Sequence, residues 1–319
     1  PPEVPSVSRP TLSVQAITFA AEDPGEWTNL LDRAVAADAA GLDRLVVSDH
    51  VAFGENLDAY ADPALGGTAG GRQPTGPDGH WLEPLTVLSH LAALTGRIRL
   101  GTGILLAALR RPVVLAKAAA TLDVLSDGRL DLGVGVGWQE EEYGAAGLDF
   151  HRRGHLLDHT LEVCRALWTE DRADYAADEL AFTGIHAMPK PRQAGGVPIW
   201  VSGTTTPRVA RRLATYGTGW IPWGPDADDP ATGITRMRRL LEDLGHDPAG
   251  LQVTGTVPAV RSDDGIDLDA TVAAVPALLE AGVTDCRINL PMPAGREAAI
   301  GVLTGLVEAF DGVTGRSTT

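Results

Sequence analysis

The chain has 319 residues, of which 44% are hydrophobic and 21% are charged. This composition excludes a disordered or fibrous protein, and the length is sufficient for a substantial hydrophobic core. The 26 Lys and Arg residues against 42 Asp and Glu residues give a formal net charge of −16. Because so acidic a surface repels phosphate backbones and anionic lipids, we expect no nucleic-acid partner and no role at a membrane surface.

The two cysteines, Cys164 and Cys286, are too few for a disulfide framework or a four-cysteine zinc site. Both lie among apolar residues, so we expect buried and inert thiols. No apolar run approaches the roughly 20 residues that a membrane span requires. The proline-rich N-terminal sequence lacks the basic-then-apolar pattern of a signal peptide. We therefore expect a cytoplasmic protein.

Strand and helix patterns alternate along the chain. Strands are predicted at 12–18, 44–48, 98–106, 130–136, 197–202, 219–222, 251–257 and 285–290. Helices are predicted at 26–40, 81–95, 112–125, 153–168, 207–216, 231–244, 268–281 and 296–310. This alternation is typical of an α/β protein with a parallel sheet closed into a (β/α)8 TIM barrel. An open doubly wound sheet is the alternative, disfavoured because no GxGxxG turn follows the first strand.

On the barrel interpretation, 1–319 is a single domain with two insertions. The first, at about 52–80, follows the second strand and is rich in Gly, Pro and Asp. The second, at about 170–196, precedes the fifth strand. A loop as long as the first is usually functional, so we expect it to form part of a substrate pocket or a lid.

Chemistry in such barrels takes place at the carboxyl ends of the strands. Ser48, Asp49 and His50 follow the second predicted strand. A histidine beside an aspartate can hold a proton near neutral pH, and the aspartate can tune it. The same residues are also consistent with a polar loop cap in which His50 is simply hydrogen-bonded.

Glycines interrupt the third and fourth predicted strands. Gly101 and Gly103 indicate either a bulge, a close approach of backbone to a ligand, or tight packing inside the barrel. Gly and Val alternate over 133–137, so the glycines share one face and leave room for a flat ring or a neighbouring layer. The acidic residues 140–142 that follow suit the positive end of the next helix dipole.

The fifth predicted strand ends in Gly and small hydroxylic residues, 202–206, and a helix carrying Arg208 begins at Pro207. Free N–H groups at such a helix start favour an anion site. Ordinary threonine capping with Pro in the first turn is the alternative.

His151, His155 and His159 recur at every fourth residue. At about 100° per residue they face away from the apolar stripe of their helix. We expect them to contact solvent, a rim or another subunit, and we expect no metal site.

Three segments together resemble the bacterial-luciferase-like superfamily, and within it the coenzyme F420-dependent oxidoreductases. They are RLVVSDHV, GRIRLGTGILLAALRRPVVLAKAAATLDVLSDGRLDLGVGVGWQEEEY and IWVSGTTTPRVARRLATYGTGW. The resemblance runs from about residue 12 to residue 220. It implies a (β/α)8 barrel, a homodimer and the cofactor F420, with FMN as the alternative.

The resemblance also implies site residues. Gly103 and Ile104 match a non-prolyl cis peptide that backs the deazaflavin ring, and Asp49 and His50 match the pair beside that ring. Ser202–Thr205 match the phosphate loop, and Glu141 matches a polar position near the ribityl chain. The expected cofactor-binding residues are Asp49, Gly103, Ile104, Leu105, Gly137, Trp138, Glu141, Ser202, Gly203, Thr204, Thr205 and Arg208.

Two positions depart from the family pattern. Trp138 stands where the F420-dependent sugar-phosphate dehydrogenases have a carboxylate base, which disfavours sugar-phosphate oxidation. Trp138 is expected to form an apolar wall instead. Thr218 replaces the aspartate of a Gly-Asp-Gly-Trp motif found in many relatives.

The first hypothesis is therefore an F420-dependent oxidoreductase acting on a small organic substrate. A hydride would move from the deazaflavin C5 to an electron-poor C=C or C=N bond of the substrate, or in the reverse direction. His50 and Asp49 are the expected catalytic residues, with His50 carrying the proton and Asp49 tuning it. The alternatives are an FMN-dependent luciferase-like monooxygenase and a cofactor-binding protein without turnover.

Overall fold

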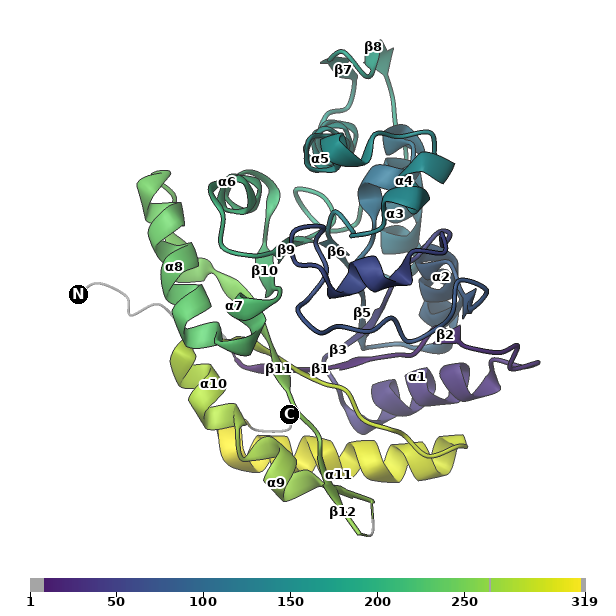
Figure 1. Ribbon diagram of the computed structural model, residues 1–319, viewed down its shortest axis with the longest axis vertical. Coiled ribbons are helices and arrows are strands. Elements are labelled where there is room, and N and C mark those ends of the chain that lie inside the picture. Colours follow the sequence, from purple (N-terminus) through teal and green to yellow (C-terminus); the bar gives the residue numbers. More distant parts are fainter. Residues whose placement is uncertain (1–8, 264, 317–319) are drawn as a thin grey trace. The chain divides into compact units, whose positions relative to one another are not determined.

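The computed structural model describes residues 9–263 and 265–316 (Figure 1). Within these residues, eight parallel strands form a closed barrel in the order β1, β14, β11, β10, β9, β6, β5, β3. The strands are β1 (Thr11–Gln15), β3 (Arg44–Val47), β5 (Arg99–Thr102), β6 (Leu130–Val134), β9 (Ile199–Gly203), β10 (Gly219–Pro222), β11 (Gln252–Val257) and β14 (Asp285–Ile288). The predicted (β/α)8 TIM barrel is confirmed, and every predicted strand overlaps one of these segments, the largest difference without containment being at β1, which ends three residues before the predicted end.

The helices begin and end close to the predicted positions. They are α1 (Thr28–Ala40), α2 (Pro84–Leu94), α3 (Pro112–Leu125), α4 (Glu140–Ala145), α5 (Arg153–Thr169), α6 (Pro207–Tyr216), α7 (Pro225–Asp228), α8 (Pro230–Asp243), α9 (Leu268–Val272), α10 (Val275–Ala281) and α11 (Arg296–Thr314). Short 3-10 helices are η1 (Leu57–Ala61), η2 (Ala107–Leu109), η3 (Phe150–Arg152) and η4 (Pro248–Gly250). Local sequence explains several of the starts, since Pro in the first turn loses no helical hydrogen bond.

The chain divides into two compact units. Unit 1 comprises Pro1–Ala16, Trp27–Val46 and Val201–Thr319, and unit 2 comprises Ile17–Glu26 and Val47–Trp200. Each unit is described by itself, and the single domain expected over 1–319 stays a prediction.

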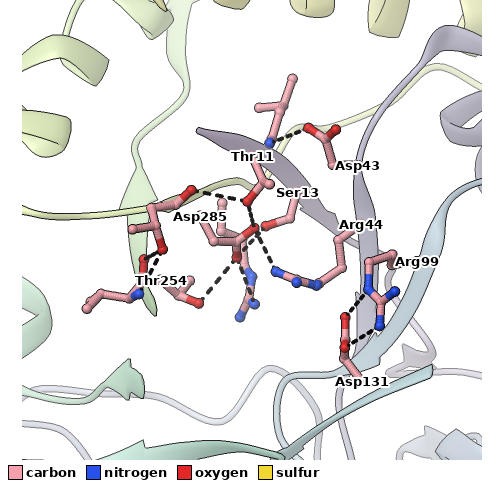
Figure 2. A network of polar contacts seen from close by, with 12 residues as sticks. Thr11, Ser13, Asp43, Arg44, Arg99, Asp131, Thr254 and Asp285 are labelled. Carbon is pink, nitrogen blue, oxygen red and sulfur yellow. Dashed lines mark hydrogen bonds and ion pairs between the residues drawn. The ribbon is translucent and has the colours of Figure 1, made fainter. Parts of the chain in front are cut away.

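Unit 1 is organised around a buried carboxylate. Asp285 accepts hydrogen bonds from Thr11 Oγ1 (2.9 Å), Ser13 Oγ (3.0 Å) and Thr254 Oγ1 (3.2 Å), and pairs with Arg44 Nη1 at 2.9 Å (Figure 2). A carboxylate in the core is tolerated only when its oxygens are satisfied in this way. Thr11, Arg44 and Asp285 are the first residues of their strands, and this end of a barrel serves stability rather than chemistry.

Apolar packing completes unit 1. Helices α1 and α11 lie against each other, and their buried side chains include Leu30, Ala34, Leu303 and Phe310. A small antiparallel ribbon, β12 (Val260–Ser262) and β13 (Gly265–Asp267), precedes α9.

Unit 2 contains β5 and β6, which are joined by a two-point ion pair from Arg99 to Asp131 at 2.6 and 2.7 Å (Figure 2). The first insertion ends at β4 (His80–Trp81), which pairs antiparallel with β2 (Phe19–Ala20). The second contains the antiparallel hairpin of β7 (Ala173–Ala176) and β8 (Ala181–Ile185) (Figure 1).

The histidine row on α5 contacts this hairpin region. His155 Nε2 lies 2.7 Å from Glu179 Oε1, and His159 Nδ1 lies 2.8 Å from the Tyr175 hydroxyl. His159 is buried rather than solvent-facing, because the hairpin strand β7 packs against α5. Among the described residues, no group of three or more His, Cys, Asp or Glu side chains is placed to hold a metal ion.

Both cysteines are free and buried, as expected. Burial raises the pKa of the Cys164 thiol to about 12, and burial together with the nearby Asp285 raises that of Cys286 to about 12. In the part of the chain that the structure describes, no helix combines the length and the apolar character needed to cross a membrane.

Candidate active site

The His50 imidazole lies in an aromatic shell within unit 2. Its ring centroid is 4.3 Å from that of Phe53, 4.9 Å from that of Trp81 and 5.8 Å from that of Trp138. The side chain is 10% exposed, and its Nδ1 lies 3.2 Å from Oε2 of Glu142. The three rings exclude most water from the imidazole, so its contact with Glu142 orients the ring.

Glu142 is the buried member of the acidic trio at the start of α4. It is 2% exposed, and its Oε1 accepts the N–H groups of Val51 (2.5 Å) and Ala52 (3.3 Å). The neighbouring Gln139 accepts the Gly54 N–H at 3.1 Å and donates to the Gly54 carbonyl at 3.3 Å. The residues at the start of α4 thereby hold the beginning of the 52–80 insertion.

Asp49 does not contact His50 in the way the sequence led us to expect. Its Oδ2 accepts the Leu106 N–H at 2.8 Å and Arg110 Nη1 at 2.6 Å, and its Oδ1 accepts Arg110 Nη2 at 3.1 Å. Successive side chains of an extended chain point to opposite sides, which separates Asp49 from His50. The carboxylate that contacts His50 is Glu142.

Burial raises the pKa of the Asp49 carboxyl, and the Arg110 guanidinium and the Leu106 N–H oppose this rise. Arg110 also binds Glu83 Oε1 at 2.8 Å. Asp49 therefore anchors the segment after β5, next to the residues expected to back a cofactor ring.

That segment contains the expected cis peptide bond between Gly103 and Ile104. The glycines that follow β6 face the same segment, which bears on the two alternatives of a flat ring or a neighbouring layer. A Cβ at Gly135 would lie 2.4 Å from Ile104 Cδ1, and a Cβ at Gly137 would lie 2.8 Å from Leu106 Cδ2. Side chains from the segment after β5 therefore fill the room these glycines leave, so the neighbouring layer occupies it rather than a ring.

A cavity of about 340 Å³ adjoins Trp138 in unit 2. Its lining residues are Asn56, Ala59, Leu65, Trp138, Glu140, Glu141 and Gly144. Three of them belong to the 52–80 insertion, which agrees with a role for that segment in a pocket. Because the Trp138 ring also contacts His50, the cavity lies beside the candidate proton carrier.

Five buried polar atoms of unit 2 have no hydrogen-bond partner among the described residues. They are Thr18 Oγ1, Ser48 Oγ, Gln73 Nε2, Trp138 Nε1 and Arg153 Nε. Each such group costs about 1–3 kcal/mol when it stays unpaired. Thr18 follows β1, Ser48 follows β3 and Trp138 lines the cavity, and these three positions favour a ligand with hydrogen-bonding edges.

The candidate phosphate loop, Ser202–Thr205, lies in unit 1. The Thr205 N–H and hydroxyl are already bound by Asp226, at 2.7 and 3.0 Å, and this carboxylate is buried. Thr206 caps α6 by accepting the Val209 N–H at 3.3 Å. A carboxylate on Thr205 disfavours a phosphate there, which leaves Ser202, Gly203, Thr204 and Arg208 as the candidate contacts.

Comparison with known sequences identifies relatives over most of the chain. A family model described as luciferase-like monooxygenase matches residues 11–283. An uncharacterized protein of Mycobacterium tuberculosis is 34% identical over 226 residues, covering 68% of this chain and 73% of the relative. A phthiodiolone/phenolphthiodiolone dimycocerosates ketoreductase of Mycobacterium kansasii is 32% identical over 276 residues, covering 83% and 73%.

Solved structures share the fold at low sequence identity. An F420-dependent secondary alcohol dehydrogenase in complex with an F420–acetone adduct has a TM-score of 0.73 at 17% identity, over 95% of this chain and 99% of that chain. A long-chain alkane monooxygenase, LadA, has a TM-score of 0.73 at 13% identity, over 98% and 93%.

Proposed function

The chain belongs to the luciferase-like monooxygenase family, an oxidoreductase and monooxygenase family, and from this premise we propose that it is an F420-dependent oxidoreductase. When bound, F420 would supply or accept a hydride at C5 of its deazaflavin ring, and a small organic substrate would offer an electron-poor C=C or C=N bond. The observation that carries the proposal is His50, a largely buried imidazole among three aromatic rings and held at one nitrogen.

The residues of unit 2 fit a flavin-type ring. Thr18 Oγ1, Ser48 Oγ and Trp138 Nε1 are buried without partners among the described residues, and such a ring carries donors and acceptors along its edges. Ser202, Gly203, Thr204 and Arg208, which belong to unit 1, stay the proposed contacts of an anionic group, as the sequence predicts.

The chain's own residues would carry the proton of the reaction and exclude water from the group that carries it. With Nδ1 of His50 directed to Glu142, Nε2 is the nitrogen that gives or takes the proton. Phe53, Trp81 and Trp138 exclude water from the imidazole. Asp49 holds the Leu106 N–H and thereby the turn after the Gly103–Ile104 bond.

Titration of the purified protein with F420 and, separately, with FMN tests this proposal through quenching of intrinsic fluorescence. We expect F420 to bind more tightly than FMN, and we expect His50→Ala to bind F420 while losing on the order of 10²–10⁴-fold in turnover. Tight FMN binding without F420 binding would replace the proposal by an FMN-dependent monooxygenase. A His50→Ala variant that binds F420 and turns over normally would remove the role of His50.

We further propose that the protein is a homodimer through the outer face of α3. This helix exposes Val113, Val114, Val124 and Leu125, of which Val114 and Leu125 are 66% and 71% exposed. A helix that is apolar nearly all round is normally covered, and exposed apolar patches of this kind mark interaction surfaces.

A further inference from the structure

We propose that Glu142 is a positioning residue that selects the tautomer of His50 and thereby leaves Nε2 as its reactive nitrogen. The inference rests on the proposed function for the use of His50 as a proton carrier. The tautomer itself is a property of the chain alone.

The donor and acceptor roles follow from the chemistry of the two side chains. Oε2 of Glu142 lies 3.2 Å from Nδ1 of His50. An ionised carboxylate can only accept hydrogen bonds, so Nδ1 must carry the hydrogen. In a neutral imidazole the other nitrogen then holds a lone pair, which makes Nε2 the acceptor for a proton.

Glu142 is itself held in place. Its second oxygen, Oε1, accepts the N–H groups of Val51 at 2.5 Å and Ala52 at 3.3 Å, and its side chain is 1% exposed. Charge-assisted bonds of this kind fix a carboxylate more strongly than neutral ones. The Val51 and Ala52 N–H groups are donors. A donor in place of Oε1 would therefore lose both of these hydrogen bonds.

The rings around His50 restrict its rotation. Phe53 and Trp81 lie within 4.9 Å of the imidazole centroid, so a flip of the ring would have to pass between them. Asp49, the other buried carboxylate nearby, is occupied by Arg110 and Leu106. Glu142 is therefore the carboxylate placed to set the tautomer.

The variant Glu142→Gln gives a sharp test in the full-length protein. The glutamine Oε1 should stay on the Val51 N–H, which turns its amide nitrogen toward Nδ1 of His50. Nδ1 must then accept, and the hydrogen moves to Nε2. Nitrogen-15 NMR of histidine-labelled protein distinguishes the two tautomers by their shifts and long-range proton couplings.

The expected result is an Nδ1–H signal for His50 in the wild type and an Nε2–H signal in Glu142→Gln, both at a pH where the ring is neutral. His50→Asn assigns the signal by its absence. Glu179→Gln is the matched control, because it removes the carboxylate from the surface pair with His155, whose atoms lie 2.7 Å apart. This control should leave the His50 signal unchanged.

An Nε2–H signal in the wild type overturns the inference, and so does an unchanged signal in a folded Glu142→Gln protein. The wild-type spectrum alone decides the matter should the variant fail to fold. F420 titration of the same samples separates this inference from the proposed function. A tautomer change without F420 binding would uphold the inference and reject the function, whereas F420 binding with an unchanged tautomer would do the reverse.

Discussion

At the scale of single residues, the two buried carboxylates near His50 have different roles because they have different partners. Asp49 binds a guanidinium and one backbone N–H, and Glu142 binds an imidazole and two backbone N–H groups. Neither role follows from the residue type. Each follows from what the fold brings within hydrogen-bond distance.

Asp49→Asn tests the anchoring role. The amide keeps the shape and can still accept from Leu106, but Arg110 loses its charged partner and keeps only Glu83. Because the substitution removes the more deeply buried of the two carboxylates on Arg110, we expect a loss of about 2–4 kcal/mol in the free energy of unfolding, measured by urea denaturation.

The matched control for Asp49→Asn is Asp174→Asn, which breaks the surface pair with Arg172, whose side chains are more than half exposed. Such pairs contribute about 0–1 kcal/mol. Equal effects of the two substitutions on stability would contradict an anchoring role for Asp49.

The sequence indicated Asp49 and His50 as candidates, because both follow a predicted strand and chemistry in barrels takes place at the carboxyl ends of the strands. It was not sufficient to select Glu142, since three consecutive glutamates at a helix start are explained by the helix dipole alone. Only the fold shows that Glu140 and Glu141 are exposed while Glu142 turns inward. Asp226 was missed for a similar reason, because it lies far along the chain from Thr205.

At the scale of elements, the strands and most helices were predictable from local pattern. The predicted helix over 268–281 instead forms two helices, α9 and α10. Pro276 explains the break, because proline has no N–H and restricts the residue before it. Gly135 and Gly137 both face the segment after β5, but the pattern could not decide between a ring and a neighbouring layer, since it carries no information about the volume of the Ile104 and Leu106 side chains.

The β7–β8 hairpin provides a pH prediction. Burial lowers the pKa of His159, whose Nδ1 contacts the Tyr175 hydroxyl. The folded chain thus favours the neutral ring, so its stabilising contribution is present above the unfolded value of about 6.5 and is lost as pH falls below it. We expect hydrogen exchange over 173–185, corrected for intrinsic rates, to be faster at pH 5 than at pH 7.

His159→Gln supplies the control, because the glutamine amide can donate to the Tyr175 oxygen, whose hydroxyl donates to Glu162, but does not titrate. The pH dependence should disappear in this variant. Glu179, which also faces this region, stays ionised throughout the interval, since its hydrogen bond with His155 lowers its pKa to about 2. A wild-type hairpin with equal protection at both pH values would contradict the prediction.

At the scale of the whole molecule, the alternation of strand and helix was enough to predict a closed barrel, and the resemblance of three sequence segments was enough to predict family membership. The choice between F420 and FMN lies beyond both sequence and fold, for a physical reason. Thr18, Ser48 and Trp138 offer hydrogen-bonding groups that suit either ring, and the loop of Ser202–Thr204 suits any phosphate. The protein would distinguish F420 from FMN by contacts with the atoms that differ between the two rings, and binding measurements with each cofactor test this preference.

The proposed homodimer predicts the behaviour of the exposed face of α3. Val114 and Leu125 stand at its two ends, eleven residues or about three turns apart, and are thus on the same side. The double variant Val114→Glu/Leu125→Glu would place four like charges at a two-fold contact without touching the core. We expect light scattering after gel filtration to give the mass of two chains for the wild type and of one chain for the variant. Leu244→Glu, at an exposed leucine just after α8, should stay dimeric, so a wild-type monomer, or a dimer that survives both α3 substitutions, rules out this interface.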